Sequence, residues 1–241
     1  MKKATKISAS RALIEDLVAG SRILAMHGVL DAYGHISARC DKRPDHFIMS
    51  RSRAPALVTV ADLMELDPDS EALPGDKRKG FIERYIHGEI YRTRPEVMAV
   101  VHSHSPSVVP FGVTRTKLRP IYHMGSFLWS GVPVWDIRNV RQENDVLVRD
   151  RPLGKALAGT LGGCNCVLMR GHGMTVVGDG VPEAVFRAIY TEMNARLQLQ
   201  ATQLEGPIQF LSEEEGKRST VSNRGTLERP WELWKSAVGR K

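Results

Sequence analysis

Three histidines are placed where the chain could bring imidazole groups together. His102 and His104 stand two residues apart at the end of the apolar run 97–101, and residues two apart in an extended segment point to the same side. His172 lies between Gly171 and Gly173, which allow the backbone to bend tightly. Three neutral imidazoles with an open position form the ligand set of a catalytic zinc-type site. The alternative is a set of ordinary buried or solvated histidines.

A carboxylate on a neighbouring segment could supply acid/base chemistry. Glu83 falls in a predicted helix over 81–94, with His87 one turn further on the same face. Next to a metal, the Glu83 carboxylate would be a candidate general acid/base. A solvated Glu–His pair on a helix surface is the alternative that the helix alone favours.

Two further segments offer groups that could bind a substrate. His35 follows Gly34, whose backbone freedom could expose the imidazole to a pocket. Ser50, Arg51 and Arg53 follow a predicted strand and bring hydroxyl and guanidinium groups, which suit carboxylates and phosphates. The alternative for this second segment is a charged surface loop.

Composition limits the class of protein. The 241 residues carry a net charge of +7, which favours an anionic partner, and we expect a small anionic substrate. Basic residues are spread along the chain without interleaved aromatics, so we expect no nucleic-acid partner. No apolar run approaches the roughly 18–20 residues of a membrane span, and no secretory signal follows the basic N-terminus. The three cysteines build no disulfide framework, and we expect a cytoplasmic protein without membrane contact.

The elements that must position these residues mix helices and strands without a regular βαβ alternation, which argues against a doubly wound sheet. Apolar periodicity and capping signals predict helices over 10–27, 81–94 and 182–205, with a short helix near 59–62. β-Branched and apolar runs predict strands over 32–39, 46–50, 97–101, 132–136, 167–169 and 175–177. We expect one domain over 1–211 and a charged extension over 212–241, which could pack on the body or on another subunit.

Taken together, these residues resemble the class II aldolase/adducin family. The resemblance rests on the early stretch GHISAR, on RPEVMAVVHSHS, on Glu83 nineteen residues before His102, and on the later Gly-His-Gly turn. It implies an α/β fold, a three-layer α/β/α sandwich around a largely antiparallel central sheet. It also implies one zinc or manganese ion per subunit on His102, His104 and His172, with Glu83 as the catalytic acid/base.

The resemblance further implies a homotetramer with active sites at subunit interfaces. The aldolases of the family use a tyrosine from the neighbouring subunit about twenty residues past the His-x-His. In this chain either Tyr122 or His123 could fill that role.

Departures from the family pattern narrow the expected substrate. Sugar-phosphate aldolases of the family carry two serines before the glutamate and Gly-Asn in the early turn, whereas this chain has Phe81-Ile82 and Gly34-His35. The stretches YGHIS, SRSRAP and ERYIHG are similar to those of the family's decarboxylases of hydroxylated aromatic acids, of the 3-hydroxy-2-methylpyridine-4,5-dicarboxylate decarboxylase type. The sequence therefore predicts a non-oxidative, metal-dependent decarboxylase of a hydroxylated aromatic or heteroaromatic acid. A retro-aldolase and a non-catalytic adducin-like binding module are the alternatives.

Overall fold

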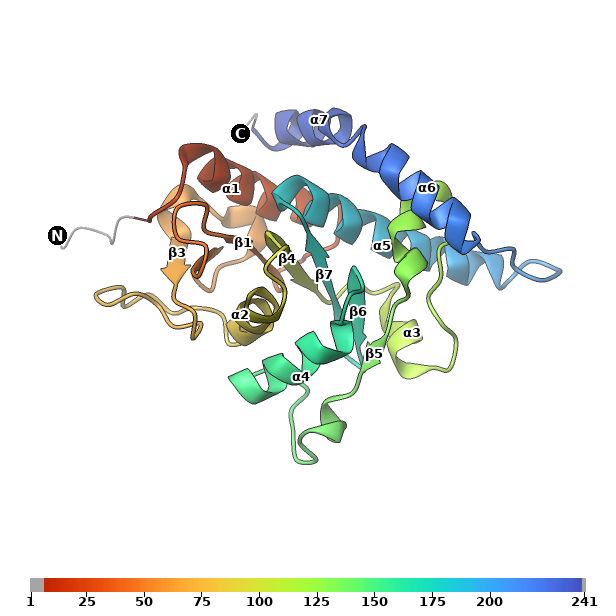
Figure 1. Cartoon of the computed structure of the whole chain (residues 1–241), viewed down its shortest axis with the longest axis horizontal. Helices are drawn as coiled ribbons and strands as arrows, with labels where there is room; N and C mark the ends of the chain where they lie inside the picture. Colours follow the sequence, from red (N-terminus) through yellow and green to blue (C-terminus); the bar gives the residue numbers. More distant parts are fainter. Residues whose placement is uncertain (1–6, 240–241) are drawn as a thin grey trace.

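The computed structural model describes residues 7–239, and its centre is one seven-stranded mixed sheet (Figure 1). The strand order is β3-β2-β1-β4-β7-β6-β5. Neighbouring strands are antiparallel except for β5 and β6, which pair in parallel. The strands are β1 (His35–Arg39), β2 (Phe47–Ser50), β3 (Leu63–Leu66), β4 (Ala99–Ser103), β5 (Val134–Trp135), β6 (Cys166–Met169) and β7 (Gly173–Gly178).

Helices cover both faces of this sheet, so the fold has three layers. On one side lie α1 (Arg11–Met26) and α5 (Val181–Ala201), and on the other α2 (Arg84–Thr93) and α4 (Arg151–Leu161) (Figure 1). The short helix α3 (Val109–Val113) packs beside β6 and β7. Alternate residues of β4 face opposite layers: Val101 belongs to the core under α1 and α5, and Val100 to the core under α2 and α4. The predicted α/β/α sandwich with a largely antiparallel sheet is confirmed.

Local signals in the sequence account for the ends of several helices. The Ser10 hydroxyl caps α1 by accepting a hydrogen bond from the Leu13 N–H, and Gly28, just past the helix end, adopts a φ of +68°. The Thr59 N–H and hydroxyl both donate to the Asp62 carboxylate, which caps the start of the 3-10 helix η2 (Val60–Asp62). The α5 helix starts with Pro182 in its first turn, as expected.

Several boundaries differ from the prediction, and two of these differences concern the site. Helix α2 begins at Arg84 rather than at residue 81, so Glu83 is its N-cap residue and not part of a helical face. Strand β4 runs on to Ser103, so His102 lies inside the strand, paired with His35 on one side and Thr175 on the other. The pairing of β4 with β1 and β7, rather than local apolar periodicity, sets the end of that strand.

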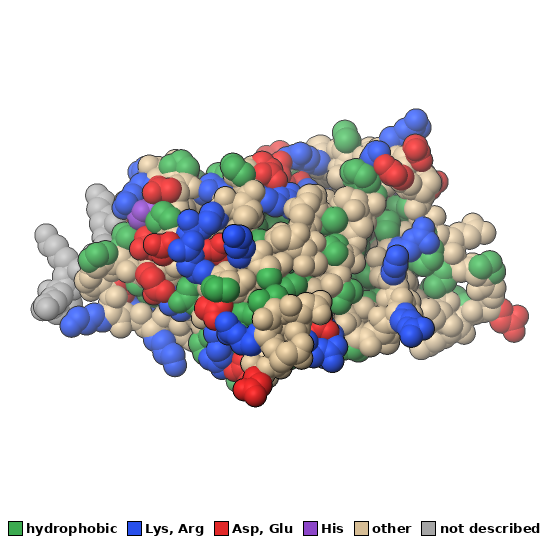
Figure 2. Space-filling model, turned by 60° about the horizontal axis from the view of Figure 1, so that its bottom comes forward, with side chains coloured by type: hydrophobic (Ala, Val, Ile, Leu, Met, Phe, Trp, Pro, Cys, Tyr) green, Lys and Arg blue, Asp and Glu red, His purple; other side chains and the backbone are tan. Residues whose placement is uncertain are grey.

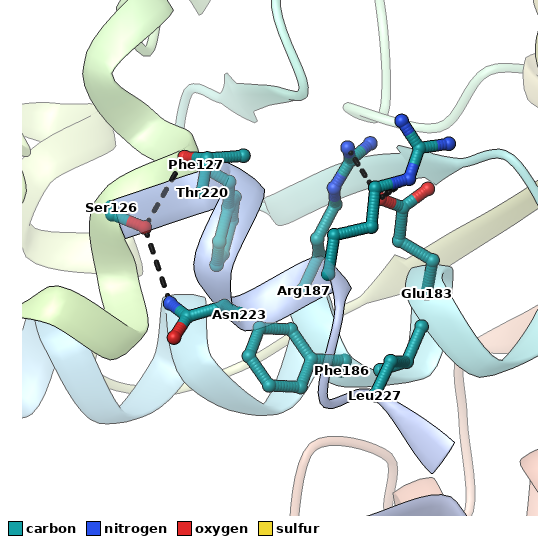
Figure 3. Close-up of a pocket in the computed structure, with 9 residues that line it drawn as sticks. Ser126, Phe127, Glu183, Phe186, Arg187, Thr220, Asn223 and Leu227 are labelled. Carbon is teal, nitrogen blue, oxygen red and sulfur yellow. Dashed lines mark hydrogen bonds and ion pairs between the residues drawn. The ribbon is translucent and has the colours of Figure 1, made fainter. Parts of the chain in front are cut away.

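The C-terminal segment packs on the body as two helices, α6 (Glu213–Arg224) and α7 (Glu228–Val238) (Figure 1). Trp231 and Trp234 of α7 are buried in the core that α1 and α5 share. Helix α6 lies along the 3-10 helix η3 (His123–Ser130), where Thr220 and Asn223 both hydrogen-bond to the Ser126 hydroxyl (Figure 3). This region is anchored by apolar burial and by polar contacts together.

A small pocket separates α5 from α6 at this contact (Figure 3). Its volume of about 20 Å³ is of the size that one water molecule needs. The Arg187 guanidinium donates to Glu183 at 2.9 Å on its wall, and Arg224 of α6 pairs with Glu183 and Asp179. The pocket therefore belongs to the packing of α6 and not to a substrate site.

The two edges of the sheet are protected. The segment after β3 folds back, so that Leu66 forms an isolated antiparallel bridge with Ala72. The Arg78 guanidinium donates to the carbonyls of Ala61 and Leu63 at the same edge. At the opposite edge β5 has only two residues.

The surface mixes charges of both signs. On the face shown in Figure 2, Lys and Arg side chains alternate with Asp and Glu and form no single continuous basic patch. In the part of the chain that the structure describes, no helix combines the length and apolar character needed to cross a bilayer.

Candidate metal and substrate site

Four side chains from three parts of the fold converge on one point. Glu83 comes from the N-cap of α2, His102 and His104 from the end of β4, and His172 from the turn between β6 and β7. One ligand atom of each lies within 4.8 Å of the others. The imidazole Nε2 atoms of His104 and His172 are 3.0 Å apart, and the Glu83 Oε2 atom is 3.4 Å from Nε2 of both His102 and His172.

The turn that carries His172 can approach β4 because of a glycine. A Cβ atom at position 173 would overlap the carbonyl oxygen of Ser103, so residue 173 has to be glycine for β7 to start here. The sequence prediction that flanking glycines let His172 approach another group agrees with this contact.

Hydrogen bonds to the backbone set the tautomers of two of the histidines. His102 Nδ1 lies 3.1 Å from the Met174 carbonyl oxygen, and His172 Nδ1 lies 2.7 Å from the Val146 carbonyl oxygen. Because a carbonyl only accepts, each Nδ1 carries a proton, and in the neutral rings each Nε2 presents a lone pair to the shared point. The buried Nε2 of His102 has no hydrogen-bond partner among the described residues. This unpaired nitrogen, close to two further imidazole nitrogens and a carboxylate, fits a cation at the shared point.

The Glu83 carboxylate faces these nitrogen atoms from the third side. Its Oε1 atom accepts a hydrogen bond from the Val148 N–H at 2.9 Å, which fixes the side chain. Burial raises its pKa, but the nearby His102 and His172 rings outweigh burial and hold the pKa far below its ordinary value. The Glu83 carboxylate is therefore ionised and lies on the same side of the shared point as the open cavity.

The loop that supplies the Val146 carbonyl is strained. Val146 has a φ of +59°, a conformation that β-branched residues rarely adopt. The Asn144 side chain accepts a hydrogen bond from the Val146 N–H at 3.1 Å and helps to hold this conformation. The strain lies next to a candidate metal ligand, where such conformations tend to cluster.

A cavity of about 340 Å³ opens beside Glu83 and His104. Its apolar wall includes Phe81 and Ile82, and its polar groups include Arg53 and Lys79. His35 also lines the cavity, with its ring 4.5 Å from that of Phe81 between centroids. The volume lies within the range typical of small-molecule sites.

The residues predicted to bind substrate divide into two pairs. His35 and Arg53 line the cavity, whereas Ser50 and Arg51 do not belong to its lining. Ser50 ends β2 and is buried, and the Arg51 guanidinium donates to the Asp62 carboxylate at 2.7 Å. Asp62 thus pairs with the Arg51 guanidinium, which was predicted to bind substrate, and its other carboxylate oxygen lies 3.3 Å from Arg53 Nε.

Tyr122 and His123 lie at the start of η3, and neither belongs to the cluster or to the lining of the cavity in the same chain. His123 is exposed, while the Tyr122 hydroxyl is buried and has no hydrogen-bond partner among the described residues. Burial raises the pKa of Tyr122 well above its ordinary value, so the phenol is neutral. A contribution from either residue to a neighbouring subunit stays a prediction.

Sequence reasoning overlooked several residues of the cavity. Tyr33, Lys79 and Leu147 line it, although they stand on loops far apart in the sequence. Only the charge of Lys79, close to the predicted helix over 81–94, could have served as a signal. Leu147 could not have been predicted to line the cavity, because no local sequence pattern places the loop that carries it next to the site.

Comparison with known proteins agrees with this fold. Residues 15–199 match the family described as the Class II Aldolase and Adducin N-terminal domain. The chain is 40% identical over 248 residues to "Decarboxylase tropJ" of Talaromyces stipitatus, with 92% of each chain covered. It is 33% identical to a 3,4-dihydroxyphthalate decarboxylase of Arthrobacter keyseri over 82% of each chain. An L-fuculose 1-phosphate aldolase structure from Glaciozyma antarctica PI12 superposes with a TM-score of 0.77 at 22% identity, over 99% of this chain and 93% of that chain.

Proposed function

The chain belongs to the class II aldolase and adducin family and is a carboxy-lyase, and we propose that it removes CO2 without oxidation from hydroxylated aromatic or heteroaromatic carboxylic acids. The proposed enzyme depends on one divalent metal ion per subunit, Mn²⁺ or Zn²⁺. We further propose that it works in the cytoplasm as a homo-oligomer, with Tyr122 or His123 completing the site of a neighbouring subunit. The free thiols of all three cysteines are in keeping with a reducing compartment.

The observation that carries the substrate proposal is the character of the cavity. Phe81 and Ile82 give it an apolar wall on which a flat ring can lie, and Arg53, Lys79 and His35 offer cationic or hydrogen-bonding groups to carboxylates. This combination supports a planar, anionic substrate. The relatives named as decarboxylases support loss of CO2.

The histidine cluster fits a metal, and His102, His104 and His172 would hold it. When bound, the metal supplies Lewis-acid stabilisation of negative charge that develops on substrate oxygen atoms. In the proposed mechanism Glu83 accepts the proton of the substrate hydroxyl and returns it to the ring carbon that loses its carboxylate. Arg53 and His35 orient a second carboxylate, and the apolar wall excludes water from the face of the ring.

A retro-aldolase is the second candidate, because the same three histidines and Glu83 would serve a cleavage that releases an aldehyde. Phe81 and Ile82 make a sugar phosphate an unfavourable substrate, since neither side chain can donate a hydrogen bond to a phosphate. Removing a dianion from water without such donors costs several kcal/mol. A non-catalytic binding module is less well supported, because it gives no reason to bury the His102 Nε2 atom without a hydrogen-bond partner.

A paired assay tests the proposal. The metal-loaded protein is incubated with hydroxylated phthalates or pyridine dicarboxylates and, separately, with fuculose or ribulose phosphates, and CO2 and aldehyde are both followed. We expect CO2 from the aromatic acids and little or no aldehyde from the sugar phosphates. Rapid aldehyde formation without CO2 from any hydroxy-aromatic acid would overturn the decarboxylase in favour of the aldolase.

A further inference from the structure

A chain of buried hydrogen bonds runs from the substrate cavity into the interior beneath α2. His35 Nδ1 lies 2.7 Å from His87 Nε2, and His87 Nδ1 lies 2.6 Å from the Ser37 hydroxyl. The Ser37 hydroxyl in turn lies 2.7 Å from the Tyr91 hydroxyl. Ser37 and His87 are 0% exposed and Tyr91 only 6%, so water has little access to these groups. None of these contacts is used in the proposed mechanism.

The His87 imidazole is neutral. Burial, followed by the neighbouring His102, lowers its pKa to about 3. The His87 ring therefore carries one proton, on one nitrogen only. The hydrogen bonds decide which nitrogen that is.

Tyr91, at the inner end of this series of hydrogen bonds, determines which atom of each pair donates. The only acceptor that the described residues offer to the Tyr91 hydroxyl proton is the Ser37 oxygen. Ser37 then has to donate its own proton to His87 Nδ1, so His87 carries its proton on Nε2 and donates to His35 Nδ1. In the opposite direction the Tyr91 proton would be buried without a partner, which is unfavourable.

We propose that Tyr91, Ser37 and His87 act as positioning residues that keep His35 Nδ1 as a hydrogen-bond acceptor and the His35 proton on Nε2, and that this N–H donates to a second carboxylate of the substrate. His35 Nε2 makes no hydrogen bond within the described residues, and the His35 side chain lines the cavity. A fixed N–H donor binds a carboxylate or carbonyl oxygen and discriminates against a group that can only donate a hydrogen bond. The second half of the proposal rests on the proposed function and specifies its substrate as a diacid.

Two measurements test this proposal. The first is the ¹⁵N chemical shifts of the ring nitrogens in protein labelled at histidine, which show directly which nitrogen carries the proton; a His35→Ala variant assigns the His35 signals. The second is the ratio of kcat/KM for a hydroxylated aromatic diacid to that for the same ring without the second carboxylate. Both are measured on the metal-loaded protein, on Ser37→Ala and on His35→Ala. Ser21→Ala is the matched control, because the Ser21 hydroxyl is also buried but donates to the Pro55 carbonyl, outside the chain of hydrogen bonds.

We expect His35 and His87 of the wild-type protein to carry their protons on Nε2. Ser37→Ala should give a mixture of His87 tautomers, because Nδ1 loses its donor, and Ser21→Ala should not. His35→Ala should lower the diacid preference by about 10-fold or more, the usual value of a hydrogen bond to a charged group. Its effect on the monoacid should be much smaller.

Three results would overturn the proposal. A proton on His35 Nδ1 in the wild-type protein would reverse the direction of the chain. Unchanged tautomers in Ser37→Ala would remove the positioning role. An unchanged diacid preference in His35→Ala would remove the carboxylate contact. Absence of CO2 from every hydroxylated aromatic acid would instead refute the proposed function and with it the diacid contact, while the ¹⁵N shifts would still decide the tautomer.

Discussion

Acidification should lower the free energy of unfolding of this protein because His87 becomes protonated in the unfolded chain. Substitution of His87 by glutamine should remove this part of the pH dependence. His87 is fully buried, and burial together with the neighbouring His102 lowers its pKa from 6.5 to about 3. His87 of the unfolded chain therefore binds a proton near pH 6.5, whereas His87 of the folded protein becomes protonated only at a much lower pH. Stability from this group is complete above the unfolded pKa and is lost as the pH falls from there toward 3.

The magnitude follows from the difference between the two pKa values. Relative to pH 7.5, His87 alone should lower the free energy of unfolding by about 1 kcal/mol at pH 5.5 and about 3 kcal/mol at pH 4.5. His87→Gln keeps an amide that can hydrogen-bond to Ser37 and His35 but has no titratable group. It should be less stable than the wild type at neutral pH and lose less stability on acidification.

The assay is urea unfolding of the metal-free protein at these three pH values, with Ser21→Ala as a control that should follow the wild type. Comparing variant and wild type cancels the contributions of all other groups that titrate in both. The difference in unfolding free energy between His87→Gln and the wild type could instead stay constant from pH 7.5 to 4.5. His87 would then bind a proton inside the folded protein, and the claim that burial lowers its pKa would be refuted.

Three further predictions concern the site. The purified protein should hold close to one divalent metal ion per chain, and His172→Ala should lose it in elemental analysis, because a three-ligand site rarely holds a metal with two; full retention would contradict the ligand assignment. Glu83→Gln should keep metal and fold but lower turnover by about 10²-fold or more, the usual contribution of a positioned acid/base group. Unchanged turnover would leave Glu83 a structural residue. Tyr122→Phe should also lower turnover if the buried Tyr122 hydroxyl serves a neighbouring subunit. Mixed oligomers of Tyr122→Phe and Glu83→Gln should then regain activity. Mixtures that stay inactive would place both residues in the site of the same subunit.

The parts of the site that depend on local geometry could be predicted from the sequence. The alternation of side chains along a strand brings His102 and His104 to one end of β4, and the glycines around His172 allow the close approach that the structure has. The family resemblance supplied Glu83 as their partner. Its place at the N-cap of α2 could not be read from apolar spacing, because the residues just before a helix carry the same pattern as its first turn.

The parts that depend on tertiary partners could not be predicted. Arg51 has the chemistry of a carboxylate ligand, but Asp62 reaches it when β2 and β3 pair. The contact of His35 with His87 joins residues 52 positions apart and exists only because α2 packs across β1. Sequence spacing identifies which groups can do chemistry, whereas competition between partners in the folded chain decides which of them are free to do it.

The protected edges of the sheet also bear on how copies of this chain can meet. An open edge strand is a template for pairing with a second chain, and uncontrolled pairing leads to aggregation. Here the Leu66–Ala72 bridge and the Arg78 guanidinium occupy one edge, and β5 is too short to offer a long row of free backbone groups at the other. We therefore expect copies of this chain to associate through side-chain surfaces of helices and loops rather than by continuing the sheet from one subunit into the next.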